Sequence, residues 1–101
     1  MIKGAPQTIT ADGVIGVSGK PVKVFAVAID SGASASVAAF HNGTADTDTL
    51  MFQSSGNSNL KVFVNNIPEE GVYFPSGCYV NVDANLGSDG LTVWHEVVSV
   101  A

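Results

Sequence analysis

The chain has 101 residues, of which 46% are hydrophobic and 13% are charged, and its formal net charge is −5. A chain of this length forms one domain, and its low charge with its apolar content argues against intrinsic disorder. Its four bases are too few for the Lys/Arg clusters that bind phosphates, and no apolar run approaches the ~20 residues of a membrane span. We therefore expect neither a nucleic acid nor a membrane as partner.

Turn residues recur at intervals of about ten positions, and the short apolar runs between them alternate as β-strands do. The sequence therefore predicts an all-β fold, a single antiparallel β-sandwich of jelly-roll or immunoglobulin type with about seven to eight strands. In chain order, the candidate strands cover residues 8–10, 14–17, 21–29, 34–41, 48–53, 60–64, 72–74, 78–84 and 91–100, and one or two of the short ones are expected not to form.

The domain boundary is placed after residue 12. Residues 1–12 are predicted to form an N-terminal arm, because Gly4 and Pro6 interrupt regular structure, and residues 13–101 form the sandwich. The alternative for residues 1–12 is a frayed end or an edge strand.

Strands with one apolar face place that face in the core. In the run Cys78–Ala84, for example, the apolar residues alternate with Tyr79, Asn81 and Asp83. Cys78 is the only cysteine, so it cannot form an internal disulfide, and its apolar face predicts a buried thiol. The predicted core residues are Phe25, Leu50, Phe52, Val62, Cys78, Val80 and Val82.

Residues 21–29 and 91–100 are apolar on both faces, and one sandwich covers only one face of a strand. Either a tightly curled barrel or the N-terminal arm covers the second face, or another subunit does. Cover by another subunit predicts self-association through apolar contact. The predicted interface residues are Ile2, Ile9, Val22, Val24, Ala26, Ala28 and Trp94.

The side chains needed for catalysis or metal binding do not occur in recognisable patterns. His41 and His95 fall on separate strands, and no nucleophile motif accompanies them. Residues 81–87 lack the glycine of a calcium loop, since Leu86 stands at that position. We therefore expect no enzyme activity, no metal and no cofactor. Carbohydrate binding stays open, because Tyr73, Tyr79 and Trp94 could stack on sugars.

Several segments resemble a family of small virion structural proteins of tailed bacteriophages, especially cyanobacterial and marine phages. The resemblance rests on the strand pair in Gly71–Asp83, on the final Leu91-Thr92-Val93-Trp94, and on Ala35–Asn42 with Thr49–Phe52. It implies a small β-sandwich that decorates or cements a capsid, without catalytic residues.

The resemblance also implies partners and a location. The partners would be the major capsid protein or other virion proteins, together with further copies of the chain, and a trimer is favoured. The protein would be soluble in the host cytoplasm before it joins the capsid surface. The predicted function is thus that of a non-enzymatic virion structural protein, and the alternative is a carbohydrate-binding or fibre-tip module.

Overall fold

The computed structural model describes residues 3–64, 67–68 and 70–98, and these residues form nine strands and no helix. The all-β prediction is confirmed, and all nine candidate strands have a counterpart, including the short ones that were expected in part not to form. The strands are β1 (Ala5–Ile9), β2 (Gly13–Ile15), β3 (Val22–Ser31), β4 (Val37–Asn42), β5 (Thr49–Ser55), β6 (Lys61–Val64), β7 (Val72–Phe74), β8 (Cys78–Val82) and β9 (Leu86–Val97).

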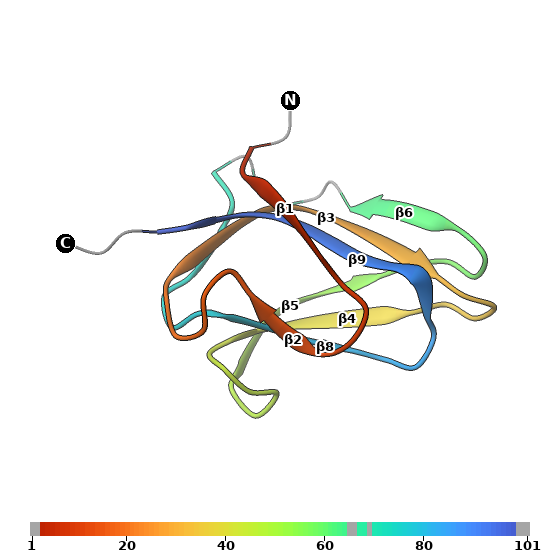
Figure 1. Ribbon diagram of the computed structural model, residues 1–101, viewed down its shortest axis with the longest axis horizontal. Helices are drawn as coiled ribbons and strands as arrows, with labels where there is room; N and C mark the ends of the chain where they lie inside the picture. Colours follow the sequence, from red (N-terminus) through yellow and green to blue (C-terminus); the bar gives the residue numbers. More distant parts are fainter. Residues whose placement is uncertain (1–2, 65–66, 69, 99–101) are drawn as a thin grey trace.

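The strands form two antiparallel sheets that pack face to face (Figure 1). One sheet has the order β1-β9-β3-β6, with β7 also paired to β3, and the other has the order β2-β8-β4-β5. The antiparallel pairs β1–β9, β2–β8, β3–β6 and β4–β5 follow one another along a rolled ribbon whose successive pairs alternate between the sheets. This strand order is that of a jelly roll, which is the first of the two sandwich types that the sequence predicts.

Part of the predicted N-terminal arm is a strand of the sandwich. Strand β1 pairs antiparallel with β9, from Ala5 opposite His95 to Ile9 opposite Leu91. Of the readings left open for residues 1–12, the edge strand is therefore the one that residues 5–9 adopt. Ile9 is partly buried and packs against the core, whereas Ile2 lies outside the described residues.

A β-bulge explains why β3 is apolar on both faces. Val24 lies opposite His95 and Ala26 lies opposite Trp94, so one extra residue of β3 falls between these two pairs. The bulge changes the phase of the strand. Val24 before it and Val27 after it are both completely buried.

The chain therefore covers most of these apolar side chains by itself. The prediction that Val22, Val24 and Ala26 lie at a subunit interface is wrong, because all three are buried within one copy. Ala28 and Trp94 are half-buried on the outer side of the β1-β9-β3 sheet.

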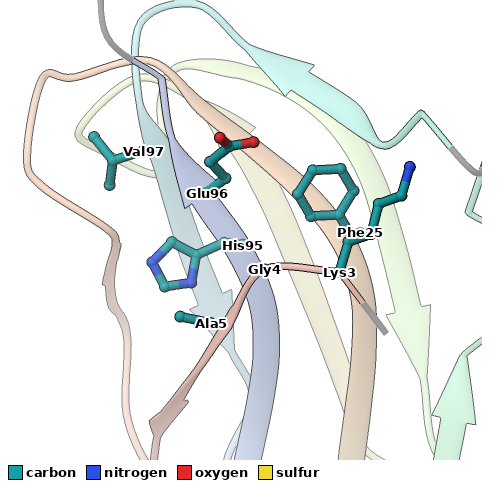
Figure 2. A pocket seen from close by; sticks show the side chains of 7 residues that line it. All are labelled: Lys3, Gly4, Ala5, Phe25, His95, Glu96 and Val97. Carbon is teal, nitrogen blue, oxygen red and sulfur yellow. The ribbon is translucent and has the colours of Figure 1, made fainter. Parts of the chain in front are cut away.

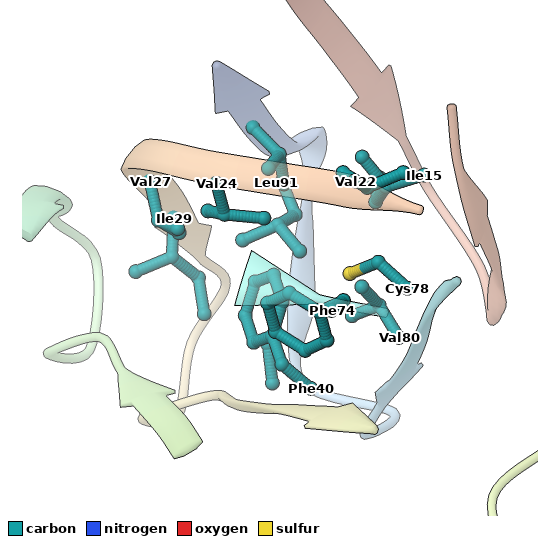
Figure 3. Close-up of a cluster of buried hydrophobic side chains, with 12 residues drawn as sticks. Ile15, Val22, Val24, Val27, Ile29, Phe40, Phe74, Cys78, Val80 and Leu91 are labelled. Atoms are coloured by element: carbon teal, nitrogen blue, oxygen red, sulfur yellow. The ribbon is translucent and has the colours of Figure 1, made fainter. Parts of the chain in front are cut away.

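The core fills the space between the two sheets and includes the predicted Cys78 and Val80, both completely buried (Figure 3). Phe52, Val62 and Val82, also predicted, are partly buried and pack against it. The other completely or almost completely buried members are Ile15, Val22, Val24, Val27, Ile29, Ala38, Phe40, Phe74, Leu91 and Val93.

Two predicted core residues lie elsewhere, and in both cases a bulge is the reason. Phe25 falls in the bulge of β3 and is only half-buried. Leu50 is 49% exposed. The register between β4 and β5 shifts after Phe40, which pairs with Phe52, so that Leu50 lies opposite His41 instead of continuing the inward face.

Candidate functional site

Strand β5 is an edge of the β2-β8-β4-β5 sheet. Among the described strands, β4 alone pairs with it, so the backbone N–H and C=O groups on its other side face outward. Such an edge is a template for a further strand, and proteins usually protect it with charge, proline, short length or a β-bulge. The composition of β5 therefore decides whether it can accept a partner.

The other edge strands are short or contain proline, whereas β5 is long and its one protective feature is the bulge at Met51. Strand β2 has three residues, and β1 contains Pro6, which has no N–H to donate to a neighbouring strand. In the sheet that contains β1, β6 and β7 lie on the far side of β3, and they have four and three residues. Strand β5 has seven residues, Thr-Leu-Met-Phe-Gln-Ser-Ser, with neither a charge nor a proline.

Large apolar side chains accompany the open edge. Leu50 is 49% exposed and Met51 is 40% exposed. Met51 lies in the bulge, between the residues of β5 that pair with Phe40 and His41. The edge thus combines outward-facing backbone groups with apolar surface, which is the composition that strand addition requires.

The ring of Phe52 anchors this edge to the core. It stacks on Phe40, with ring centroids 4.4 Å apart and an angle of 10° between the planes. A second, tilted contact joins Phe52 to Phe74 at 6.0 Å. Because Phe40 and Phe74 are completely buried, these contacts hold β5 against the core.

The loop that leads into β5 is organised by Asp48. Its Oδ2 accepts hydrogen bonds from the backbone N–H groups of Thr44 at 2.8 Å and Ala45 at 3.0 Å. The backbone oxygen of Asp48 lies 3.0 Å from Nδ1 of His41, which is almost fully buried. These contacts fix the start of β5 relative to β4.

Beside β5, the outer face of the same sheet carries an aromatic and polar group of side chains. The ring centroids of His41 and Tyr79 lie 6.5 Å apart, and Nδ2 of Asn81 donates to Oδ2 of Asp46 at 3.4 Å. Desolvation raises the pKa of Tyr79, and the negative charges of Asp12 and Asp46 raise it further. Tyr79 therefore remains a neutral phenol at physiological pH, able to donate one hydrogen bond.

The three aromatic residues considered for sugar binding do not share one surface. Tyr79 lies on β8, whereas Tyr73 on β7 and Trp94 on β9 belong to the other sheet. Tyr73 and Trp94 are also separated by β3, which pairs with both of their strands. A stacking platform made of all three side chains is excluded by this placement.

An open pocket of about 490 Å³ lies beside the start of β1 and the end of β9, which pair antiparallel. Figure 2 shows His95 and Val97 on one side of β9, and Glu96 and Phe25 on the other. Within the described part of the chain, no three His, Cys, Asp or Glu side chains gather as a metal site would require. The pocket is lined by Lys3, Gly4, Ala5, Phe25, His95, Glu96 and Val97.

The interface predicted from sequence and the open edge found in the structure are different surfaces. Sequence reasoning placed Leu50 in the core and did not single out Met51. A usable signal was present, since no charged residue occurs between Asp48 and Lys61 in the sequence. A long uncharged segment that includes a strand is typical of a strand that another strand covers.

No protein-family model matches this sequence, and no curated protein or solved structure matches it. No helix long and apolar enough to cross a membrane occurs among the described residues. The resemblance to phage virion proteins remains a prediction.

Proposed function

We propose that this chain is a non-enzymatic structural protein of a tailed-phage virion, which decorates or cements the capsid. The observation that carries the proposal is the open, uncharged edge of β5, with Leu50 and Met51 exposed beside it. A jelly roll with such an edge is suited to assembly, because added strands contribute main-chain hydrogen bonds and apolar contact. Jelly rolls also occur in viral capsid proteins, although a fold alone does not define a function.

In this proposal, the partners are the major capsid protein or other virion proteins, and further copies of the chain. The contact owes little to ion pairs, because the β5 edge has no charged side chain. Binding should therefore persist at molar salt, where exposed charges are screened beyond about 3 Å. The protein would reach the capsid surface from the host cytoplasm.

The direct test is mass spectrometry of purified virions from the phage that encodes the chain. The proposal predicts that the chain co-purifies with the major capsid protein through a density gradient in molar salt. A chain that stays in the lysate, with none in the particles, would contradict it. A phage carrying Gln53→Lys should incorporate less of the chain than a phage carrying the control Ser88→Lys, which places the same charge on another exposed residue.

A carbohydrate-binding role is the second candidate, and one observation favours it. Half-exposed Tyr79 lies beside the hydrogen-bonded pair of Asn81 and Asp46, and sugar sites combine an aromatic face with such polar groups. Glycan-array binding that Tyr79→Ala abolishes and Tyr73→Ala preserves would support it. Absence of binding to any glycan would reject it.

A further inference from the structure

We infer that β5 of one copy pairs antiparallel with β5 of a second copy about a twofold axis, joining their two four-stranded sheets into one continuous sheet. This inference deepens the proposed function, because it names the partner that covers the open edge. Three features of the described residues lead to it: the charges that flank β5, the faces to which its side chains point, and the protection of the other edges.

The charges near β5 favour a second copy in the antiparallel direction. Exposed Asp46 and Asp48 precede the strand, and the turn that follows it, residues 56–60, is neutral. An antiparallel pair sets the acidic end of each copy against the neutral end of the other, and Lys61 is the next charged residue beyond that end. A parallel pair would place the carboxylates side by side, where like charges destabilise a sheet.

The alternation of side chains restricts the register. Ser54 is buried and Phe52 packs against the core, whereas Gln53 between them is exposed. Residues directly opposite one another in a sheet project from the same face, so inward residues must pair with inward residues. The twofold axis is therefore expected beside Gln53, where inward Phe52 lies opposite inward Ser54, whereas an axis beside Phe52 would set Leu50, which the bulge turns outward, opposite buried Ser54.

The size of the edge sets the strength of the contact. A stable pair of proteins buries about 800 Å² on each partner, and a strand of seven residues with two exposed apolar side chains offers less than a broad face does. We therefore expect a weak dimer in solution, with a Kd on the order of 10–100 μM. On a particle, many such contacts would act together and hold more strongly.

Sedimentation equilibrium from about 10 μM to about 1 mM tests the pairing, because this range brackets the expected Kd. The native chain should shift from monomer to dimer with concentration. Gln53→Lys places two like charges beside the axis and should weaken dimerisation at least about tenfold, whereas Ser88→Lys should leave it unchanged. Circular dichroism checks that both variants keep the β-sheet spectrum. A native monomer throughout, or equal effects of the two variants, would overturn the inference.

Disulfide trapping tests the register separately. The native Cys78 is completely buried and should not react. Any cross-link therefore forms through the added surface cysteine. If the axis passes beside Gln53, Gln53→Cys should form cross-linked dimers under mild oxidation. If it passes beside Phe52, cross-linking should require Met51→Cys in one copy and Gln53→Cys in the other. Neither variant cross-linking faster than Ser88→Cys would overturn the pairing.

The outcomes separate this inference from the proposed function. A dimer formed through β5 with no chain in purified virions would reject the virion role and keep the pairing. Incorporation into virions by a chain that remains monomeric at about 1 mM would keep the virion role and reject the pairing.

Discussion

The rings of Phe40 and Phe52 stack 4.4 Å apart and join the edge strand β5 to the buried strand β4. Phe40 is completely buried, whereas Phe52 is partly open because no described strand lies beyond it. This pair holds the part of β5 that follows the bulge against the core. A partner strand would therefore meet a preformed edge, and little ordering free energy would be lost on binding.

Phe52→Ala should destabilise the fold by about 2–3 kcal/mol, less than the loss of a fully buried phenylalanine, because Phe52 is only partly buried. Urea unfolding gives the free energy directly. The neighbouring exposed Gln53→Ala should change it by less than about 0.5 kcal/mol. Equal effects of the two changes would show that the Phe40–Phe52 stack contributes little.

The sequence predicted the fold class and a counterpart for every strand, since strand alternation and turn residues are local signals. It did not predict which residues of β3 face inward. Val24 and Val27 both lie in the core although an odd number of positions separates them. The bulge that produces this phase change depends on pairing with Trp94 and His95 of β9, far along the chain. A local pattern does not contain that information.

The candidate site was harder to predict for a similar reason. Leu50 and Phe52 alternate as inward residues of a strand, yet only Phe52 packs on the core, because the bulge near Met51 turns Leu50 outward. That β5 lies at an edge follows from the order of strands in the sheet. Strand order is set by the packing of the whole chain, and composition could at most suggest it through the uncharged segment before Lys61.

The stability of the protein should fall at alkaline pH because of Cys78. Burial raises the pKa of its thiol from 9.0 to about 12. As the pH rises, the thiol of the unfolded chain loses its proton before the thiol of the folded chain does. The contribution of Cys78 to the free energy of unfolding is therefore complete below pH 9.0. It is lost as the pH rises toward about 12, at about 1.4 kcal/mol per pH unit. Urea unfolding at about pH 8 and about pH 11 should show a steeper loss for the native chain than for Cys78→Ala. Parallel slopes would show that the thiol ionises freely in the folded state.

Gly43→Ala should destabilise the protein more than Gly19→Ala does. Both glycines have positive φ, 153° and 76°, which an alanine adopts at a cost of about 1–2 kcal/mol. A Cβ on Gly43 would also overlap the carboxylate of Asp48, whereas a Cβ on Gly19 meets no described atom within 4 Å. Thermal unfolding of the two variants should therefore differ, with Gly43→Ala melting lower. Equal melting temperatures would indicate that Asp48 moves aside without loss.

Ser54→Ala should stabilise the protein by about 1 kcal/mol. The Ser54 hydroxyl is buried, and no described residue forms a hydrogen bond with it. Replacing it with a methyl group removes a desolvated polar atom and leaves almost the same volume. Ser36→Ala is the matched comparison and should destabilise, because the Ser36 hydroxyl lies 2.6 Å from that of Ser31. Destabilisation by both changes would mean that the Ser54 hydroxyl has a partner.

Hydrogen exchange followed by mass spectrometry at low and high protein concentration tests the role of the β5 edge most directly. If β5 is the contact strand, peptides that cover Thr49–Ser55 should exchange more slowly at high concentration, and peptides of β1 and β9 should not change. Gln53→Lys should remove the difference, and molar salt should preserve it. Protection that is independent of concentration, or that appears around Trp94 instead of β5, would contradict the account.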